Sequence, residues 1–240
     1  MPKSTSARVF IALIIISGLC VFGDAVLNAN SVYAVRFVSF VLVACVAARL
    51  RLKLPGSTGN MSVNLPFILV AVAEMSSLEA LIVGCVSTVV QTLPRKKPSK
   101  VNSVQAAFNF GNMALAIAAT RLVFQSGILA SGIASAPIRL CVAALVFFLI
   151  NSVPVAIVIA LSEAKSVLRT WIGMAQMSFA YFVASAGIAA TVLTLTIRIG
   201  WEVPIAVMPL MLGIYLSYKR LLGIGAGTNQ PAATAMAAKA

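Results

Sequence analysis

The sequence predicts an all-α, polytopic membrane protein: a helical bundle of about eight membrane segments with both termini on the cytoplasmic side. Of its 240 residues, 61% are hydrophobic, whereas ordinary globular domains contain about 45–50% apolar residues. Its long charge-free runs approach the roughly 20 apolar residues that cross a hydrocarbon core as a helix. The runs are continuous rather than alternating, which favours helices over a β-barrel.

The first expected span is Val9–Leu27. Basic residues precede it, as in a signal peptide, but the run contains no clean small-residue cleavage site, so we expect an uncleaved span. A polar link follows at Asn28–Ser31. The second expected span is Val32–Ala48, which Arg36 interrupts.

The stretch Arg49–Lys100 holds two short apolar runs between basic clusters. After the loop-forming residues Leu54–Asn60, the runs are Ser62–Ala73 and Leu78–Leu93, joined near Met75–Ser77. Because both flanks are basic, both are expected on the same side of the membrane. The two runs therefore either both cross, tilted or in a locally thin region, or form a re-entrant hairpin.

Four further spans are expected, at Asn102–Phe124, Ile138–Leu161, Trp171–Ile197 and Val203–Tyr218. Pro154, Pro204 and Pro209 each free a backbone carbonyl and can kink the helices that contain them. The Gly/Ala-rich end, residues 223–240, is predicted to be a disordered cytoplasmic tail. The expected domains are thus an integral-membrane helical domain over residues 1–222 and this tail.

The placement of the basic residues sets the expected orientation. With the N-terminus inside, all but four of the 18 Lys and Arg residues face the cytoplasm, as the positive-inside rule requires; the four are Arg36, Arg121, Arg139 and Arg198. The net charge of +13 is then an orientation signal, with attraction to anionic lipid at the inner face rather than to nucleic acid. We expect a multi-pass protein of the bacterial cytoplasmic (inner) membrane, in contact with the lipid bilayer.

Most of the acidic residues fall in the outer layer together with those four arginines: Asp24, Glu74, Glu79 and Glu202. Charges at membrane depth are costly, and they usually pair or face a cavity. Arg36 and Arg121 lie inside their spans, with Glu74 and Glu79 as the natural partners. Two interpretations follow: an ion-paired plug that holds helices together, or an outward-facing pocket in which Arg36 or Arg121 anchors a small anionic or zwitterionic ligand.

A polar stripe marks the span at 102–124. Its members, separated by 3, 4 and 3 residues, share one helical face: Asn102, Gln105, Asn109 and Asn112. They are expected to meet Asn151 of the next span, or Gln176, Ser178 and Tyr181 of the one after it. The stripe is either interhelical hydrogen-bond glue or the lining of a ligand or ion path; in the second case Asn109 and Asn112 join the ligand-binding candidates.

Several chemistries are excluded. The chain has no histidine, so a His-ligated zinc or haem site is ruled out, and its four cysteines are single and dispersed. A hydrolytic triad is not expected without histidine, and five dispersed acids do not form a metal-dependent phosphotransferase. We therefore predict no catalytic residues, no metal and no cofactor: the protein is not expected to be an enzyme.

Short motifs resemble one bacterial group, the MASE-type integral-membrane sensory modules that precede HD-GYP phosphodiesterase and GGDEF cyclase domains. They are Arg51-Leu-Lys-Leu-Pro55-Gly56, Met61-Ser62, Glu79-Ala80, Phe108-Asn109 and Pro209 followed by Tyr215-Leu-Ser-Tyr218-Lys-Arg220. The resemblance covers roughly residues 9–222 and implies a membrane module that senses a signal. Only the Gly/Ala-rich tail follows Arg220, so we expect no output domain, and cyclic-dinucleotide chemistry does not carry over.

Three functions are compatible with these features. The first is a stand-alone sensory, ligand-binding or partner-binding module, whose membrane or cytoplasmic protein partner docks on the basic inner face. The second is a small transporter, or the substrate-capture membrane subunit of one. The third is a structural subunit of a larger membrane complex.

Overall fold

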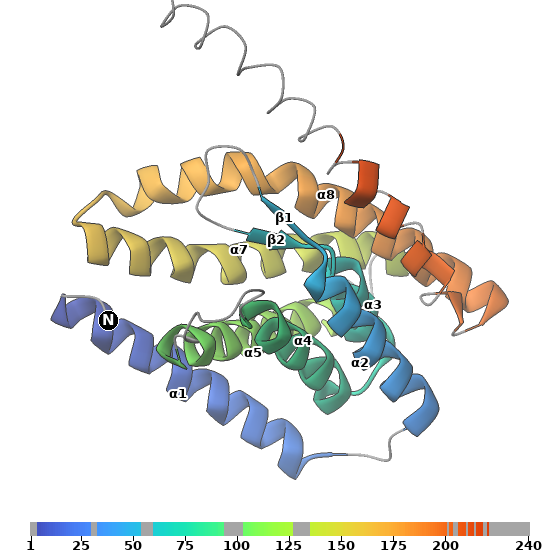
Figure 1. Cartoon of the computed structure of the whole chain (residues 1–240). Helices are drawn as coiled ribbons and strands as arrows, with labels where there is room; N and C mark the ends of the chain where they lie inside the picture. Colours follow the sequence, from blue (N-terminus) through green and yellow to red (C-terminus); the bar gives the residue numbers. More distant parts are fainter. Residues whose placement is uncertain are drawn as a thin grey trace, which may run out of the picture.

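The protein is a bundle of α-helices with one short β-ribbon (Figure 1). The computed structural model describes residues 4–29, 33–53, 60–93, 103–126 and 135–200, together with 202–203, 206–209, 211–213, 215–217 and 220. The helices are α1 (Thr5–Leu27), α2 (Ala34–Arg49), α3 (Leu65–Glu74), α4 (Ser77–Thr92), α5 (Ser103–Gln125), α7 (Ala136–Glu163) and α8 (Val167–Ile199). The antiparallel strands β1 (Arg51–Lys53) and β2 (Asn60–Ser62) join α2 to α3.

The helices confirm the membrane bundle but not its segment count. Within the described residues, four helical stretches are long and apolar enough to cross a membrane: α1, α5, α7 and residues Ser178–Thr196 of α8. The apolar helices α3 and α4 are shorter, and α2 has 16 residues. The last expected span is only partly described, and the tail at 223–240 lies outside the described residues. Eight segments and the orientation therefore stay predictions.

Two prolines of the sequence lie within helices whose bounds the structure defines. Pro66 lies in the first turn of α3, where its missing N–H has no helical partner to lose. α7 continues through Pro154 as one helix of 28 residues. Pro154 therefore does not end the helix, because neighbouring helices can satisfy the carbonyl that the proline leaves without a donor.

The short helix α3 forms the centre of the core. Eight of its ten residues are buried, because α2, α4, α5 and α8 all pack against it. Ten residues at 1.5 Å rise reach about 15 Å, which is half of a typical hydrocarbon core. α3 is thus too short to cross such a core by itself, and α4 has 16 residues; the crossing pair and the re-entrant hairpin both stay predictions for the 49–100 stretch.

The remaining helices enclose this centre. α7 lies between α5 and α8, and Figure 1 shows α7 and α8 side by side. α1 packs against α5, and a Cβ atom on Gly18 would lie only 2.3 Å from the Cα of Gly111. The two backbones are thus in direct contact, as small residues permit in membrane helices. Large apolar side chains on the outer faces of α1 and α2, such as Leu13, Ile16 and Leu42, are exposed and suit contact with lipid.

Ala164, at the end of α7, has a left-handed backbone conformation (φ 52°, ψ 41°). This conformation costs a non-glycine residue about 1 kcal/mol or more. We therefore expect Ala164→Gly to raise the free energy of unfolding by roughly 0.5–1 kcal/mol. Thermal unfolding of both proteins in detergent measures this change in stability. Ala164→Val should have the opposite effect, and a melting temperature that falls with glycine would contradict the explanation.

Candidate functional site

The link between α3 and α4 is fixed by capping at the start of α4. Ser76 is the N-cap: its Oγ accepts a hydrogen bond from the Glu79 backbone N–H at 3.3 Å. The Ser76 backbone N–H donates in return to Oε2 of Glu79 at 2.9 Å. This reciprocal capping box satisfies two backbone donors at the half-buried start of α4 and so fixes where α4 begins.

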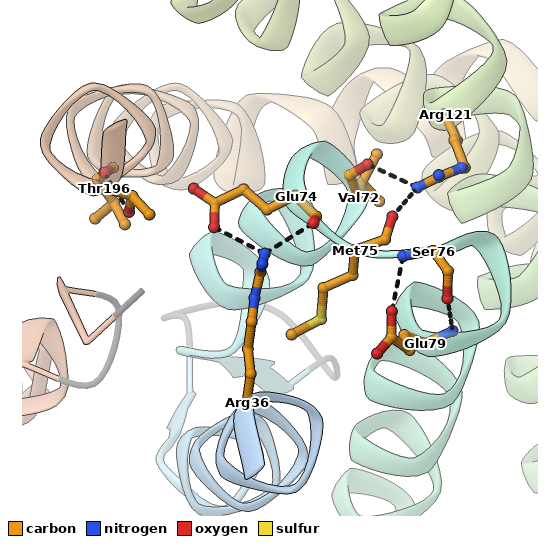
Figure 2. A network of polar contacts seen from close by, with 9 residues as sticks. Arg36, Val72, Glu74, Met75, Ser76, Glu79, Arg121 and Thr196 are labelled. Atoms are coloured by element: carbon orange, nitrogen blue, oxygen red, sulfur yellow. Dashed lines mark hydrogen bonds and ion pairs between the residues drawn. The ribbon is translucent and has the colours of Figure 1, made fainter. Parts of the chain in front are cut away.

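Two arginines hold the other side of the break, the C-terminal end of α3 (Figure 2). Nη2 of Arg36, from α2, donates to the backbone carbonyl of Glu74 at 2.8 Å and to its carboxylate at 3.1 Å. Nη1 of Arg121, from α5, donates to the carbonyls of Val72 at 3.1 Å and Met75 at 2.5 Å. Carbonyls at a helix end lack intrahelical partners and carry partial negative charge, so both guanidinium groups stabilise the end of α3.

The expected ion pairs are therefore half confirmed. Arg36 and Glu74 form the predicted pair, with 3.1 Å between Nη2 and Oε2. Arg121 differs: its hydrogen bonds go to backbone carbonyls, while the carboxylate of Glu79 serves the capping box and attracts Arg121 only through space.

A cavity of about 630 Å³ lies where the α3–α4 link meets α1 and α5. Polar groups at its wall come from three parts of the chain. Asp24 lies in α1 and Asn28 directly follows it, Ser76 and Ser77 lie at the α3–α4 link, and Arg121 and Gln125 lie in α5. Apolar side chains complete the wall, among them Val21, Leu78, Leu81, Ile117 and Leu122. The cavity thus combines one cationic and one anionic side chain with an apolar surface.

The predicted polar stripe lies away from this cavity. Nδ2 of Asn112 donates to the backbone carbonyl of Asn151 at 2.9 Å and to its Oδ1 at 3.2 Å, which confirms the expected contact with the next span. Asn109 is half-buried on the same helix, and neither residue is among those that line the cavity. The Asn112–Asn151 contact is interhelical hydrogen bonding between α5 and α7.

The other predicted polar packing residues are scattered. Gln105 and Gln176 are exposed, and Asn102 lies outside the described residues. Tyr181 lies beside Ser185 and the backbone of Leu65, at the start of α3. Tyr181 therefore links α8 to the hairpin rather than to the stripe.

Among the predicted ligand-binding residues, the cavity contains Arg121 alone. Arg36 and Glu74 bind each other on another side of α3, and the Glu74 carboxylate points toward Thr196 of α8 (Figure 2). Reasoning from the sequence placed Asp24 in the outer layer but did not assign it to the site. It missed Asn28 and Gln125 as well. All three lie at the ends of α1 and α5, where two helices that end on the same side bring their last turns together.

Comparison of the chain with protein-family models, with curated proteins and with solved structures finds no match.

Proposed function

We propose that this protein is a membrane sensory module that binds a small anionic or zwitterionic ligand from the outer side. The observation that carries the proposal is the cavity between α1, the α3–α4 link and α5, with Arg121 in its wall. Its volume, about 630 Å³, falls within the roughly 300–1,000 Å³ of small-molecule sites. A few polar groups on a largely apolar wall are also typical of such sites.

The predicted orientation supports access from outside. With the N-terminus in the cytoplasm, α1 and α5 both end at the outer surface, and their last residues line the cavity. The re-entrant hairpin then starts and ends at the inner surface, and its tip forms the base of the site. Occupancy at the tip thus has a direct structural route to the inner face, where a cytoplasmic or membrane protein partner and anionic lipid would bind the basic residues.

The substrate-capture subunit of a transporter is the second candidate. A helix pair that enters the membrane and returns is a feature of transporter substrate sites, and here it borders the cavity. Purification from native membranes separates the two: a bound ATPase supports the transporter subunit, and a bound signalling enzyme supports the sensor. In neither case do we propose catalysis by this chain.

Cys20 provides a test of the site, because it is exposed and lines the cavity, whereas Cys141 is exposed on α7 away from it. We compare two single-cysteine variants that retain either Cys20 or Cys141. If the cavity opens to water on the outer side and the exposed surface of α7 contacts lipid, a membrane-impermeant thiol reagent added to intact cells will modify Cys20 and leave Cys141 unmodified.

Inverted membrane vesicles give the control for orientation, since the reagent should then fail to reach Cys20. Modification of Cys20 from the cytoplasmic side alone would refute access from outside. Absence of modification from both sides, with modification restored in detergent-unfolded protein, would show that the cavity is closed to water and would refute the proposed site.

A further inference from the structure

Asp24 occupies an electrostatically unfavourable position. It lies in the last turn of α1, where the carbonyl oxygens without helical partners carry partial negative charge. A cationic group is favoured at such a position, and an anionic one is disfavoured. That turn contains no basic residue. Oδ1 of Asp24 accepts a hydrogen bond from Nδ2 of Asn28 at 3.1 Å, and the same Nδ2 donates to the Asp24 carbonyl at 3.0 Å. Among the described residues, no cation pairs with this carboxylate.

Two of the other helix ends near the cavity, the end of α3 and the start of α4, are already compensated. Arg36 and Arg121 satisfy the end of α3, and the Ser76–Glu79 capping box satisfies the start of α4. The C-terminal ends of α1 and α5 both reach the cavity, neither has a basic residue in its last turn, and Asp24 adds a full negative charge at the end of α1. A cationic group in the cavity beside Asp24 would relieve it.

Arg121 supplies the opposite half of a binding site. Both of its hydrogen bonds use Nη1. A guanidinium has five N–H donors, two of them on Nη1, so three remain on Nε and Nη2. Two of these form the planar fork that binds a carboxylate with two parallel hydrogen bonds. Arg121 is thus able to hold the end of α3 and an anion at the same time.

We infer that the cavity selects amphipathic zwitterions with the chemistry of an apolar α-amino acid. The carboxylate binds the free edge of Arg121, the ammonium group binds Asp24 with help from the amide oxygens of Asn28 and Gln125, and the apolar body contacts Leu81 and Ile117. This inference rests on the proposed function and narrows it, because an anionic ligand alone would leave the Asp24 carboxylate without a cationic partner.

The test uses the full-length chain in detergent and three sets of probes. Each set contains an apolar amino acid (leucine, phenylalanine or tryptophan), the deaminated acid with the same body, and the decarboxylated amine. Calorimetric titration measures affinity, and thermal unfolding measures stability. We expect at least one amino acid to bind, and its two single-charge analogues to bind about tenfold to a hundredfold more weakly, since each lacks one charged hydrogen-bonding group.

Asp24→Asn tests the assignment of the ammonium site. It is expected to weaken amino-acid binding by about tenfold or more and to leave binding of the deaminated acid unchanged. Because the substitution removes an acid from a helix C-terminus, the ligand-free protein should melt at a higher temperature. A purely structural role for Asp24 predicts a lower melting temperature and equal weakening of all probes. Glu202→Gln, which changes an acid that does not line the cavity, is the matched control and should change no affinity.

The outcomes separate the two proposals. Equal affinity for an amino acid and its deaminated acid would overturn the zwitterion inference and leave an anion-binding cavity intact. Binding by none of the nine probes would overturn the inference as well. If the impermeant reagent added from outside failed to modify Cys20, the proposed function itself would be refuted.

Discussion

Arg121→Gln is expected to lower the free energy of unfolding by about 2–5 kcal/mol, the largest effect of any single polar substitution proposed for this protein. The change leaves the carbonyls of Val72 and Met75 without the donor that holds the end of α3. Each unsatisfied buried polar group costs about 1–3 kcal/mol. Reversible unfolding in mixed detergent micelles measures the loss.

Arg139→Gln is the matched control for this prediction. Arg139 is also a half-buried arginine, but its guanidinium packs over the ring of Phe124, with 5.3 Å from Cζ to the ring centre, and its Nε has no hydrogen-bond partner. Such a contact contributes about 0.5–2 kcal/mol. Equal losses in the two variants would show that general charge burial, rather than the backbone contacts of Arg121, determines the effect.

Gly18→Ala is expected to destabilise the bundle by about 1–3 kcal/mol through overpacking. The new Cβ would lie 2.3 Å from the Cα of Gly111 and 2.5 Å from its carbonyl oxygen, so two backbones rather than flexible side chains must separate. The control lies on the same helix: a Cβ on Gly23 meets nothing within 4 Å. Gly23→Ala should therefore be neutral or stabilising, because alanine favours helix more than glycine does.

The measurement is thermal unfolding of both glycine variants together with titration of the amino-acid probes. Gly18→Ala should also weaken probe binding, since α1 and α5 both line the cavity. If Gly18→Ala and Gly23→Ala melted at the same temperature, the close crossing of α1 and α5 would not be a determinant of stability.

The sequence was sufficient to predict the helical membrane bundle and the ends of its longer helices, because charge-free runs and polar links are visible residue by residue. It also led to the Arg36–Glu74 pair, since a buried cation and a buried acid in the same layer have few other partners. Helical spacing placed Asn112 on a polar face expected to meet either Asn151 or the polar residues of the following span, and the structure shows the contact with Asn151.

The role of Arg121 was out of reach for a physical reason. Its partners are backbone carbonyls, which every residue carries, and they become acceptors only because α3 ends at Glu74. A sequence pattern marks the start of α4 through Ser76 and Glu79, but gives no residue-specific sign of which carbonyls stay unpaired. The cavity was equally hidden, because it depends on how closely α1 and α5 approach at Gly18 and Gly111.

The contact between Gly18 and Gly111 is the point about which α1 would rotate if it tilted against α5, because the two backbones touch there. Nine residues separate Gly18 from the end of the helix at Leu27, a lever arm of about 14 Å at 1.5 Å per residue. A tilt of about 5° around the crossing displaces the end of such an arm by about 1 Å. A rigid-body tilt of α1 about this crossing would therefore change the width of the cavity at the C-terminal end of α1 by about 1 Å, while the backbone contact at the crossing stays in place.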